Sequence, residues 1–381
     1  MQQHDLLIVG AGPVGLALAL SLKDAGLDIV LADTRPADAA AADPRVLALS
    51  HGTRLTLEQL GVWQTLSPTD ICTIHISQQG SFGRTCLQAD DYDLPALGHV
   101  LPAGGLAKAL RTAVERAGIT ILDNTEVTRL APTATDVAIS LRGQHASTRY
   151  ARLAACAEGG MAQDDPEVVE HDYHQHALIA QVGSHGGHRH TAFERFTASG
   201  PMALLPCGQG YAVVHVVDEQ RADEMLALDD ARYLALLQHT IGQRVQLEGI
   251  TDRLRYPLLL RYRRKPTGQR TVWLGNAAQT LHPVAGQGFN LALRDVHALA
   301  QAVLDHTSDP GSHAVLSAYQ GARGLDRLGT IRFTDGLVRL FSNDIAPLRH
   351  ARGAGLFALD ICPPLRHFIA KRMMFGARAW P

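Results

Sequence analysis

The stretch DLLIVGAGPVGLALALSL, residues 5–22, decides the fold of this 381-residue chain. Its apolar start, residues 5–9, predicts a fully buried strand, and the Leu/Ala-rich part after Gly15 predicts a helix. A second apolar strand is predicted at residues 28–32 and ends at Asp33. The glycines between the first strand and the helix have the spacing G-x-G-x-x-G, which is typical of a strand that turns into a dinucleotide-binding helix.

Each of the three glycines has its own expected task. Gly10 permits the tight turn, Gly12 lets the backbone approach a pyrophosphate, and Gly15 allows close packing of helix on strand. The helix N-terminus offers free N–H groups to the phosphates. Asp33 follows Gly10 by 23 residues, close to the ~20-residue spacing of an acid that binds the ribose hydroxyls. This motif alone fits either FAD or a nicotinamide nucleotide.

Composition limits the classes of function. Lys and Arg number 35 and Asp and Glu 37, so the net charge of −2 gives no electrostatic reason to expect a nucleic-acid partner. Five widely spaced cysteines without a CxxC pair indicate neither a disulfide framework nor a zinc site. The apolar N-terminal run contains Pro13 and follows Asp5 rather than a basic region, so it predicts no signal peptide or membrane span. We expect a soluble, cytoplasmic protein.

A second strand–loop–helix pattern lies near the other end of the chain. Residues 271–274 predict a short strand, followed by the loop GNAAQTLHPVAGQGFN at 275–290 and a helix through 291–304. Glycines stand where the backbone must pass close to a flat or anionic group, and the helix start directs free N–H groups out of the loop. Taken alone, ordinary turn chemistry explains this segment equally well.

Together, the two motifs resemble those of the group A flavoprotein aromatic hydroxylases, whose second FAD motif has the pattern G-D-A-A-H-x-x-x-P-x-x-G-Q-G-x-N. Within that group the chain is most similar to the ubiquinone-biosynthesis hydroxylases, and among these to the ones that act on 2-polyprenyl-6-methoxyphenol. The resemblance covers almost the whole chain and includes DPR at 43–45, ALS at 48–50, LGVW at 60–63, ALGHV at 96–100, FERF at 193–196 and the segment 275–295.

The resemblance implies an α/β fold in which a Rossmann-like FAD-binding domain is interleaved with a smaller antiparallel-sheet substrate domain, followed by a helical C-terminus. The corresponding segments are 1–70, 98–170 and 264–345 for the FAD domain, 71–97 and 171–263 for the substrate domain, and 346–381 for the C-terminus. Within the substrate segments the sequence predicts strands near 176–182, 193–196, 202–206 and 211–217, a strand pair within 71–94, and a helix pair at 222–247.

The resemblance also assigns site residues. The first glycines and Asp33 would hold the FAD pyrophosphate and ribose, Arg45 lies in the segment that folds over the cofactor, and Val127 matches a strand whose backbone meets the adenine. Gly275 opens the second motif, in which Asn276 stands where the family usually has an Asp facing the pyrophosphate and ribityl chain. The residues expected along the isoalloxazine are Pro283, Gly286, Gln287 and Gly288, with Asn290 completing the loop.

No residue is assigned a certain catalytic role. His282, Pro283 and Gln287 are candidates because they would lie beside the flavin. For His282, a role in the structure of the loop is as reasonable as a catalytic one.

The sequence departs from the family pattern in mid-chain. The family carries A-D-G-x-x-S there, linked to FAD and to NADPH engagement, whereas this chain has Glu158 and Gly159. The extra methylene of Glu158 shifts any hydrogen bond that it makes to the loop. The acidic run DDPE at 164–167 follows, where the family often has Arg. We expect FAD binding to survive, with the pyridine nucleotide held differently or the activity weakened.

Two further features each have two explanations. The segment HGGHRH at 185–190 clusters three histidines, but its glycines and its position between predicted strands favour a hairpin loop over a metal site. Residues 356–381 carry apolar residues at helical spacing, interleaved with Arg366, Lys371, Arg372 and Arg378. This pattern fits a basic amphipathic helix on an anionic membrane surface or a terminal helix packed on the sheet.

The resemblance implies an FAD-dependent monooxygenase that uses NADPH or NADH and O2 to hydroxylate the ring of a polyprenyl methoxyphenol in ubiquinone biosynthesis. A polyprenyl phenol substrate implies peripheral contact with the inner membrane face and other ubiquinone-biosynthesis proteins as partners. Two alternatives stay open: a hydroxylase of a small soluble phenol, and a low-activity flavin-binding subunit of a biosynthetic complex.

Overall fold

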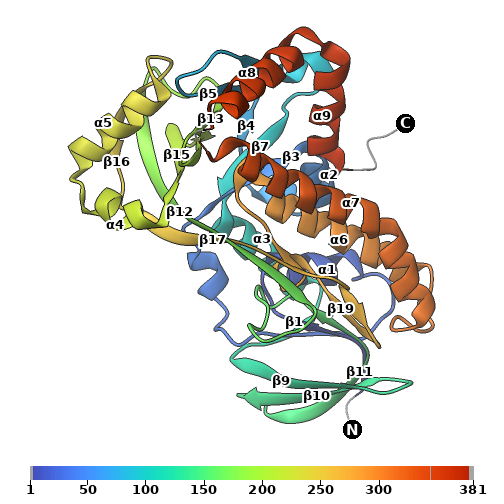
Figure 1. The fold of residues 1–381 in the computed structure, drawn as a ribbon. Helices are drawn as coiled ribbons and strands as arrows, with labels where there is room; N and C mark the ends of the chain where they lie inside the picture. The colour runs from blue at the N-terminus through green and yellow to red at the C-terminus, as the bar shows by residue number, and fades with distance from the viewer. Residues whose placement is uncertain (1–2, 344, 377–381) are drawn as a thin grey trace.

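The computed structural model describes residues 3–343 and 345–376, and its central element is an eight-stranded sheet (Figure 1). The strand order is β18-β19-β11-β1-β2-β8, and β10 and β9 continue antiparallel from β11. The bounds are β1 (Gln3–Val9), β2 (Ile29–Ala32), β8 (Thr120–Leu122), β9 (Thr125–Pro132), β10 (Val137–Gly143), β11 (Ser147–Cys156), β18 (Thr267–Gly268) and β19 (Thr271–Trp273). Because β1, β11 and β19 run parallel, both predicted cofactor motifs begin at the same edge of this sheet.

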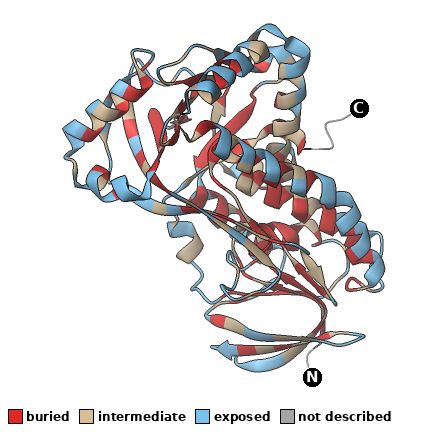
Figure 2. Cartoon of the chain, viewed as in Figure 1, coloured by how far each residue is buried: buried red, intermediate tan, exposed pale blue. Residues whose placement is uncertain are grey.

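Helices cover one face of this sheet and the β9–β10 pair covers the other. The helices are α1 (Pro13–Ser21), α3 (Ala103–Arg116), α6 (Gln287–Leu304) and α7 (His313–Phe341). Their apolar residues form one core with β1, β2, β11 and β19, which Figure 2 shows as buried. On the opposite face, Leu7 and Val30 pack against Val137 and Ile139 of β10. The α6 helix begins at Gln287, four residues before the predicted start.

The second large sheet has nine strands in the order β20-β17-β12-β15-β14-β13-β5-β6, with β16 paired to β12. The bounds are β5 (Thr73–Gln78), β6 (Arg84–Gln88), β12 (Val168–His185), β13 (Thr191–Thr197), β14 (Gly200–Cys207), β15 (Gly210–Asp218), β16 (Gln246–Ile250), β17 (Leu254–Arg263) and β20 (Gln279–Thr280). All pairs are antiparallel except β5–β13. The α/β class, the largely antiparallel second sheet and the strand pair within 71–94 are confirmed. The domain boundaries stay a prediction.

The two faces of the nine-stranded sheet have different coverings. On one face lie α4 (Glu219–Ala227) and α5 (Asp230–Ile241), which bury Tyr233 and Leu237 against β12 to β15. This confirms the predicted helix pair. On the other face, Phe196 of β13 packs with Phe341 of α7 and with Val284 of the second glycine loop. This face therefore lies toward the predicted cofactor site.

The predicted hairpin at residues 185–190 is wrong. β12 ends at His185 and β13 begins at Thr191, but β15 and β14 lie between these two strands in the sheet. The segment is instead a loop that crosses over β15 and β14. Hydrogen bonds hold it in place, from His188 Nε2 to the Gly208 carbonyl at 3.1 Å and from His190 Nδ1 to the Asp70 carbonyl at 3.2 Å. Within residues 3–343 and 345–376, no three His, Cys, Asp or Glu side chains are grouped as metal ligands.

A small sheet joins the two large ones. Its strands are β3 (Val46–Ser50), β7 (Gly98–Pro102) and β4 (Thr69–Ile71), and α2 (His51–Gln59) follows β3 directly. Ser50 begins this helix, because its hydroxyl accepts a hydrogen bond from the Thr53 N–H at 3.3 Å.

The C-terminal part forms two helices, α8 (Ala346–Ile361) and α9 (Pro363–Phe375). The break follows from the two prolines at 363 and 364, which cannot continue an α-helix from the preceding turn. Ala370 and Met374 of α9 are buried, and the Arg366 guanidinium donates to the Asp360 carbonyl at 2.9 Å. This helix is therefore packed on the protein, as one of the two explanations expects; Arg378 lies outside the described residues. No described helix is long and apolar enough to span a bilayer.

Candidate active site

The turn from β1 to α1 has the shape that a phosphate group needs. Gly10 has φ +102°, and a Cβ there would lie 2.5 Å from the Ala157 carbonyl oxygen. A Cβ on Gly15 would lie 2.0 Å from the Gly10 carbonyl oxygen, whereas Gly12 faces only the Arg35 guanidinium at 3.7 Å. No side chain caps α1, so its first N–H groups keep their capacity to bind an anion. The residues present fit a pyrophosphate at Gly12.

Asp33 lies at the end of β2, directly beside this turn. Its carboxylate accepts a hydrogen bond from the Ala11 N–H at 2.7 Å and from the Arg35 side chain at 3.1 Å. Burial raises the pKa of Asp33, but the hydrogen bonds from Arg35 and Ala11 outweigh it, so the pKa lies below its ordinary value. Asp33 is thus an anchored carboxylate, and Arg35 adds a cation that the sequence reasoning missed. Arg35 could have been found from its position in the sequence, two residues after the acidic residue that is predicted to bind the ribose.

The second glycine loop meets the first motif. Gly275 has φ +57°, and a Cβ there would lie 3.1 Å from Val14 at the start of α1. Gly286, also at positive φ, faces Ala48 of β3 in the same way. In contrast, nothing lies within 4 Å of a Cβ placed on Gly288. The loop is therefore packed against protein on one side and open at Gly288, which fits the close approach of a flat ring.

Asn290 holds the shape of this loop. Its amide oxygen accepts hydrogen bonds from the Ser50 N–H at 2.9 Å and the Thr53 hydroxyl at 2.7 Å. Its amide nitrogen donates to the carbonyls of Ala48 at 3.0 Å and Gly286 at 2.8 Å. All its hydrogen bonds go to protein, so it acts by fixing the loop on β3 and α2. Asn276 is exposed beside the start of α1, and its contact with a cofactor stays a prediction.

His282 lies inside the second glycine loop, and whether its role there is structural or catalytic stays a prediction. The side chain is fully buried, its Nδ1 accepts a hydrogen bond from the Val284 N–H at 3.1 Å, and its ring meets that of Tyr173 edge-on at 5.4 Å. Burial lowers the pKa of His282 to about 4, so the ring is neutral at physiological pH. Gln287, at the first position of α6, donates to the Ala285 carbonyl at 3.2 Å. Pro283 begins the short turn at 284–286.

The altered mid-chain segment follows β11 and packs on the Gly10 turn. A Cβ on Gly10 would lie 2.9 Å from the Cα of Glu158, while Gly159 faces open space. Burial raises the pKa of Glu158, and a backbone hydrogen bond and the charge of Arg263 oppose this effect. The Glu158 side chain is exposed. A contact of Glu158 or Gly159 with the cofactor stays a prediction.

Arg263 is a second residue that sequence reasoning missed. Its guanidinium forms an ion pair with Asp165 at 2.5 Å, donates to the Ala277 carbonyl at 3.2 Å and lies 4.2 Å from the ring centroid of Trp273. The acidic run at 164–167 therefore has an arginine partner from the distant strand β17. This pairing ties the altered segment to the second glycine loop.

Arg45 and Val127 lie in different sheets, and a contact of either with the cofactor stays a prediction. Arg45 pairs with Asp43 at 2.6 Å, and its guanidinium carbon lies 5.9 Å from the ring centroid of Tyr256 in β17. The arginine thus connects the small sheet with the nine-stranded sheet. Val127 lies half-buried in β9, whose first residue donates its N–H to the Asp33 carbonyl at 2.8 Å.

Glu194 is the third residue that sequence reasoning did not single out. Because side chains alternate along a strand, Ala192, Glu194 and Phe196 share one face of β13. Ala192 packs with Val100 of the small sheet, and Phe196 packs with Val284 of the glycine loop. Glu194 lies between these contacts, and no hydrogen bond or ion pair joins its carboxyl to another described residue. Burial among apolar neighbours raises the pKa of Glu194 to about 7.

Glu194 could have been found in the sequence as an acidic residue at an inward-facing position of a predicted strand. Along β13 the alternate residues on this face are apolar on both sides of the glutamate. A carboxyl placed there loses solvation without gaining a partner, which destabilises the folded state. Groups with such perturbed pKa values are frequent at functional sites. The face of β13 that packs on the glycine loop through Phe196 therefore carries a carboxyl that can accept a proton.

Comparison with known proteins identifies relatives over the whole chain. Residues 3–327, which include both glycine motifs, match the family model described as an FAD binding domain. The ubiquinone hydroxylase UbiL of Rhodospirillum rubrum is 31% identical over 392 residues, which cover 99% of this chain and 91% of that protein. The 3-demethoxyubiquinol 3-hydroxylase of Escherichia coli is 27% identical, with 94% of this chain and 95% of that protein covered.

Among solved structures, the chain has the fold of p-nitrophenol 4-monooxygenase PnpA from Pseudomonas putida DLL-E4. The TM-score is 0.77 at 16% sequence identity, and the match covers 99% of this chain and 100% of that one. At this identity the likeness establishes the fold alone. It confirms the predicted flavin-monooxygenase architecture, including the helical C-terminal region.

Proposed function

Because this chain belongs to the ubiquinone-biosynthesis hydroxylases, a family of FAD-binding monooxygenases, we propose that it hydroxylates the aromatic ring of a polyprenyl methoxyphenol with NADPH or NADH as electron donor. The chain is an FAD-dependent aromatic hydroxylase, and the substrate and donor are the proposed part. Two relatives support the substrate, since one is a ubiquinone hydroxylase and the other acts on 3-demethoxyubiquinol by name. The observation that carries the proposal is the face of β13 where Phe196 packs with Val284 of the glycine loop and where Glu194 places a carboxyl between Ala192 and Phe196.

Different residues of the site would hold different parts of FAD. The amides at the start of α1 and the Arg35 guanidinium would hold the pyrophosphate, and the Asp33 carboxylate would hold the ribose. The open backbone at Gly288 would accommodate the flat ring system, and Asn290 fixes that backbone in place. Bound FAD supplies the redox chemistry and the activation of O2. The protein supplies orientation and excludes water from the ring.

Glu194 is the proposed proton acceptor for the substrate hydroxyl. A phenol has a pKa of about 10, so it is largely protonated at neutral pH, and withdrawal of its proton makes the ring more electron-rich. A general base works best with a pKa near the working pH, and burial raises the pKa of Glu194 to about 7. Its neighbours on this face, Ala192 and Phe196, are apolar and suit an aromatic ring.

The experiment that tests the function follows the absorbance of bound FAD in anaerobic stopped flow. The protein is mixed with NADPH or NADH, with and without 2-polyprenyl-6-methoxyphenol, and then with air-saturated buffer. We expect reduction that the phenol accelerates, followed by reoxidation and a product one oxygen atom heavier by mass spectrometry. FAD that stays oxidised with both nucleotides would contradict the catalytic proposal and favour a flavin-binding subunit.

Two controls separate the substrate and the donor. A methoxyphenol without the prenyl chain tests substrate length, since equal turnover of both phenols would favour a small soluble substrate. The Glu158→Asp variant restores the residue common in the family. If Glu158 limits engagement of the nucleotide, this variant accelerates reduction without changing FAD retention.

A further inference from the structure

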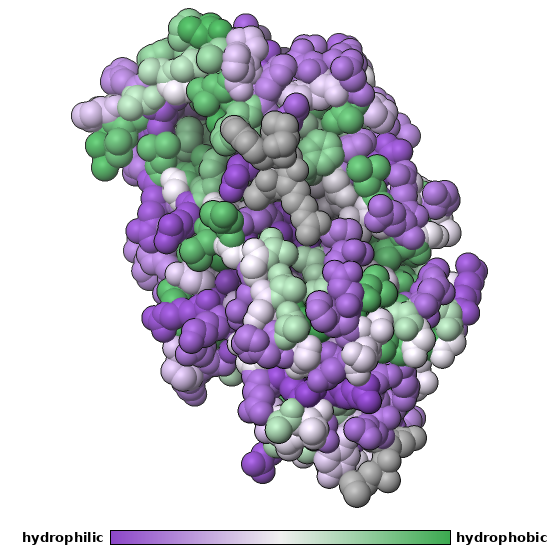
Figure 3. Space-filling model, turned by 90° about the vertical axis from the view of Figure 1, so that its right-hand side faces the viewer, coloured by the Kyte–Doolittle hydropathy of each residue, from purple (hydrophilic) through white to green (hydrophobic). Residues whose placement is uncertain are grey.

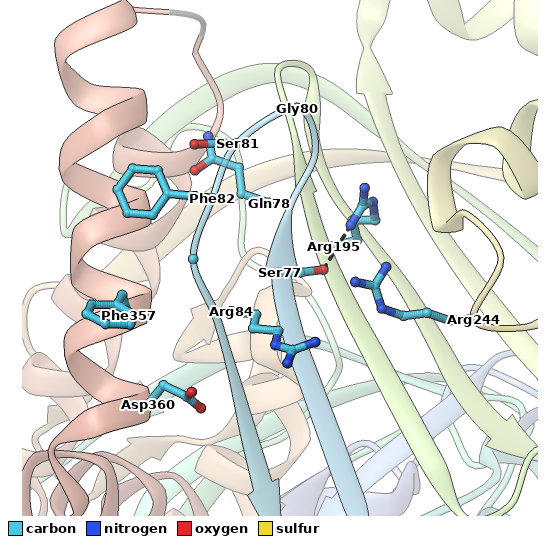
Figure 4. A pocket seen from close by; sticks show the side chains of 11 residues that line it. Ser77, Gln78, Gly80, Ser81, Phe82, Arg84, Arg195, Arg244, Phe357 and Asp360 are labelled. Atoms are coloured by element: carbon cyan, nitrogen blue, oxygen red, sulfur yellow. Dashed lines mark hydrogen bonds between the residues drawn. The ribbon is translucent and has the colours of Figure 1, made fainter.

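A hollow lies between the nine-stranded sheet and α8. It has a volume of about 810 Å³ and is bounded by the β5–β6 turn, β13, the segment after α5, and α8 (Figure 4). Three guanidinium groups line it, from Arg84, Arg195 and Arg244. These side chains come from three separate parts of the chain, so only the fold brings them together. The proposed hydroxylation assigns no task to this hollow.

Positive charge exceeds negative charge in the hollow, since three guanidinium groups and one carboxylate, that of Asp360, line it. Arg195 Nη1 donates to the Ser77 hydroxyl at 3.1 Å, and its Nε is buried with no partner in the part of the chain that the structure describes. Burial lowers the pKa of Arg195, and Arg244 lowers it further. Among described residues no ion pair joins the three arginines to an acid. Asp360 lines the hollow from α8, across β6 from the arginines (Figure 4).

His75 lies near all three guanidinium groups. It lies on β5 two residues before Ser77, and therefore on the same face of the sheet. Burial lowers the pKa of His75, and Arg244, Arg84 and Arg195 each lower it further. A group that experiences all three guanidinium charges lies in a field that attracts an anion.

The rim of the hollow is apolar and exposed. Phe82 at the β5–β6 turn and Phe357 of α8 are 56% and 50% exposed. Ile361 lies one helical turn after Phe357 and is 63% exposed, and Leu365 and Phe368 of α9 are also exposed. Hydrophobic side chains are frequent at this upper end of the molecule, at the height of α5, α8 and α9 (Figure 3). Aromatic side chains in water beside a cation cluster are typical of surfaces that insert into a lipid interface.

We propose that this hollow binds the phosphate of an anionic phospholipid at a membrane surface, with Phe82 and Phe357 inserted beside the lipid headgroup. Charge complementarity selects an anion, and the exposed aromatic rim selects one that is attached to acyl chains rather than a free phosphate. The site also relocates the membrane contact expected from the sequence. That contact was placed on the basic residues of α9, but Arg366 is turned toward the protein and bonds to Asp360.

The test measures sedimentation of the FAD-loaded protein with vesicles of phosphatidylcholine, with and without phosphatidylglycerol. We expect binding only to the vesicles with phosphatidylglycerol, and release by added salt because the screening length shortens. An arginine near an anionic surface contributes about 1 kcal/mol, so Arg84→Gln/Arg244→Gln should weaken binding about thirtyfold. The matched control is Arg116→Gln/Arg129→Gln, which removes the same charge from α3 and β9, remote from the hollow (Figure 1).

Two further measurements make the outcome decisive. The Phe357→Ser variant should bind more weakly with an unchanged dependence on salt, since it removes only the apolar contribution. Titration with inorganic phosphate at constant ionic strength tests the other source of the same anion. The proposal is overturned if the arginine pairs have equal effects, if the protein ignores anionic vesicles, or if it binds free phosphate here but no vesicle. Retained FAD absorbance shows that each variant is folded, and sedimentation requires no turnover, so the hydroxylase proposal can fail separately.

Discussion

Replacement of Glu194 by glutamine should stabilise the protein in a pH-dependent way. Burial raises the pKa of this carboxyl from 4.5 to about 7, so the folded state holds the proton more tightly than the unfolded chain. As pH rises through this window the buried group must ionise, and the free energy of unfolding falls by about 3 kcal/mol in total. Glu194→Gln removes a titrating group without changing its size. The variant should therefore gain up to about 3 kcal/mol at pH 8 and little at pH 4.5.

The assay is urea unfolding of the FAD-saturated protein across this pH range. The matched control is Glu248→Gln on β16, an exposed glutamate in the same sheet, which should show no such pH-dependent gain. A Glu194→Gln gain of equal size at pH 4.5 and pH 8 would refute the reasoning, because it would mean that the carboxyl does not titrate in the folded state.

The same variant should lose activity while it gains stability. If Glu194 accepts the phenol proton, kcat/KM of the native enzyme rises as pH increases through about 7 and then levels off. Glu194→Gln should flatten this limb and lower kcat/KM by about 10²- to 10⁴-fold, the usual contribution of a general base. If kcat/KM of the variant keeps the pH dependence of the native enzyme, Glu194 does not accept the phenol proton.

Three other substitutions test the scaffold of the site. Gly15→Ala places a methyl 2.0 Å from the Gly10 carbonyl oxygen, so α1 must shift, and we expect purified protein with little FAD by absorbance. Asn290→Ala removes four hydrogen bonds that fix the loop; flavin fluorescence after dilution should show faster FAD release. Asp295→Asn weakens the fully buried pair with Arg323 at 2.7 Å, and because Arg323 keeps its pair with Asp326, urea unfolding should show a loss of about 1–3 kcal/mol.

The elements around the two glycine motifs could be predicted because each motif is local. In the first, strand, turn and helix follow within about twenty residues, and the structure gives a steric reason for Gly10 and Gly15, such as the approach of Gly10 to Ala157. Although β16, β17 and β20 were missed, the strands β5, β6 and β12 to β15 of the second sheet were also predicted, since apolar runs between turns mark them. Their order was not, because the crossing from β12 to β13 over two intervening strands leaves no local trace in the sequence.

The residues that sequence reasoning missed depend on contacts between distant segments. Arg263 serves the altered mid-chain segment only because β17 lies beside it, and its partner Asp165 is 98 residues away. Glu194 becomes notable only when its face of β13 is known to meet the glycine loop. The three arginines of the hollow likewise lie far apart in the sequence, so no local motif marks them. Sequence patterns predict the local structure of a segment, whereas these sites depend on contacts between segments that are distant in the sequence.

The placement of β19 and α6 has a consequence for synthesis of the chain on the ribosome. β1 pairs with β11, β11 pairs with β19, and Gly275 packs against the start of α1. The glycine motif at the N-terminus therefore stays half of a site until some three hundred residues have left the exit tunnel. Until then residues 154–156 at the end of β11 lack their β19 partner, and unpaired strand residues can associate with other chains. FAD can be held by both motifs only late in synthesis, so cofactor supply should limit the yield of folded protein rather than the start of folding.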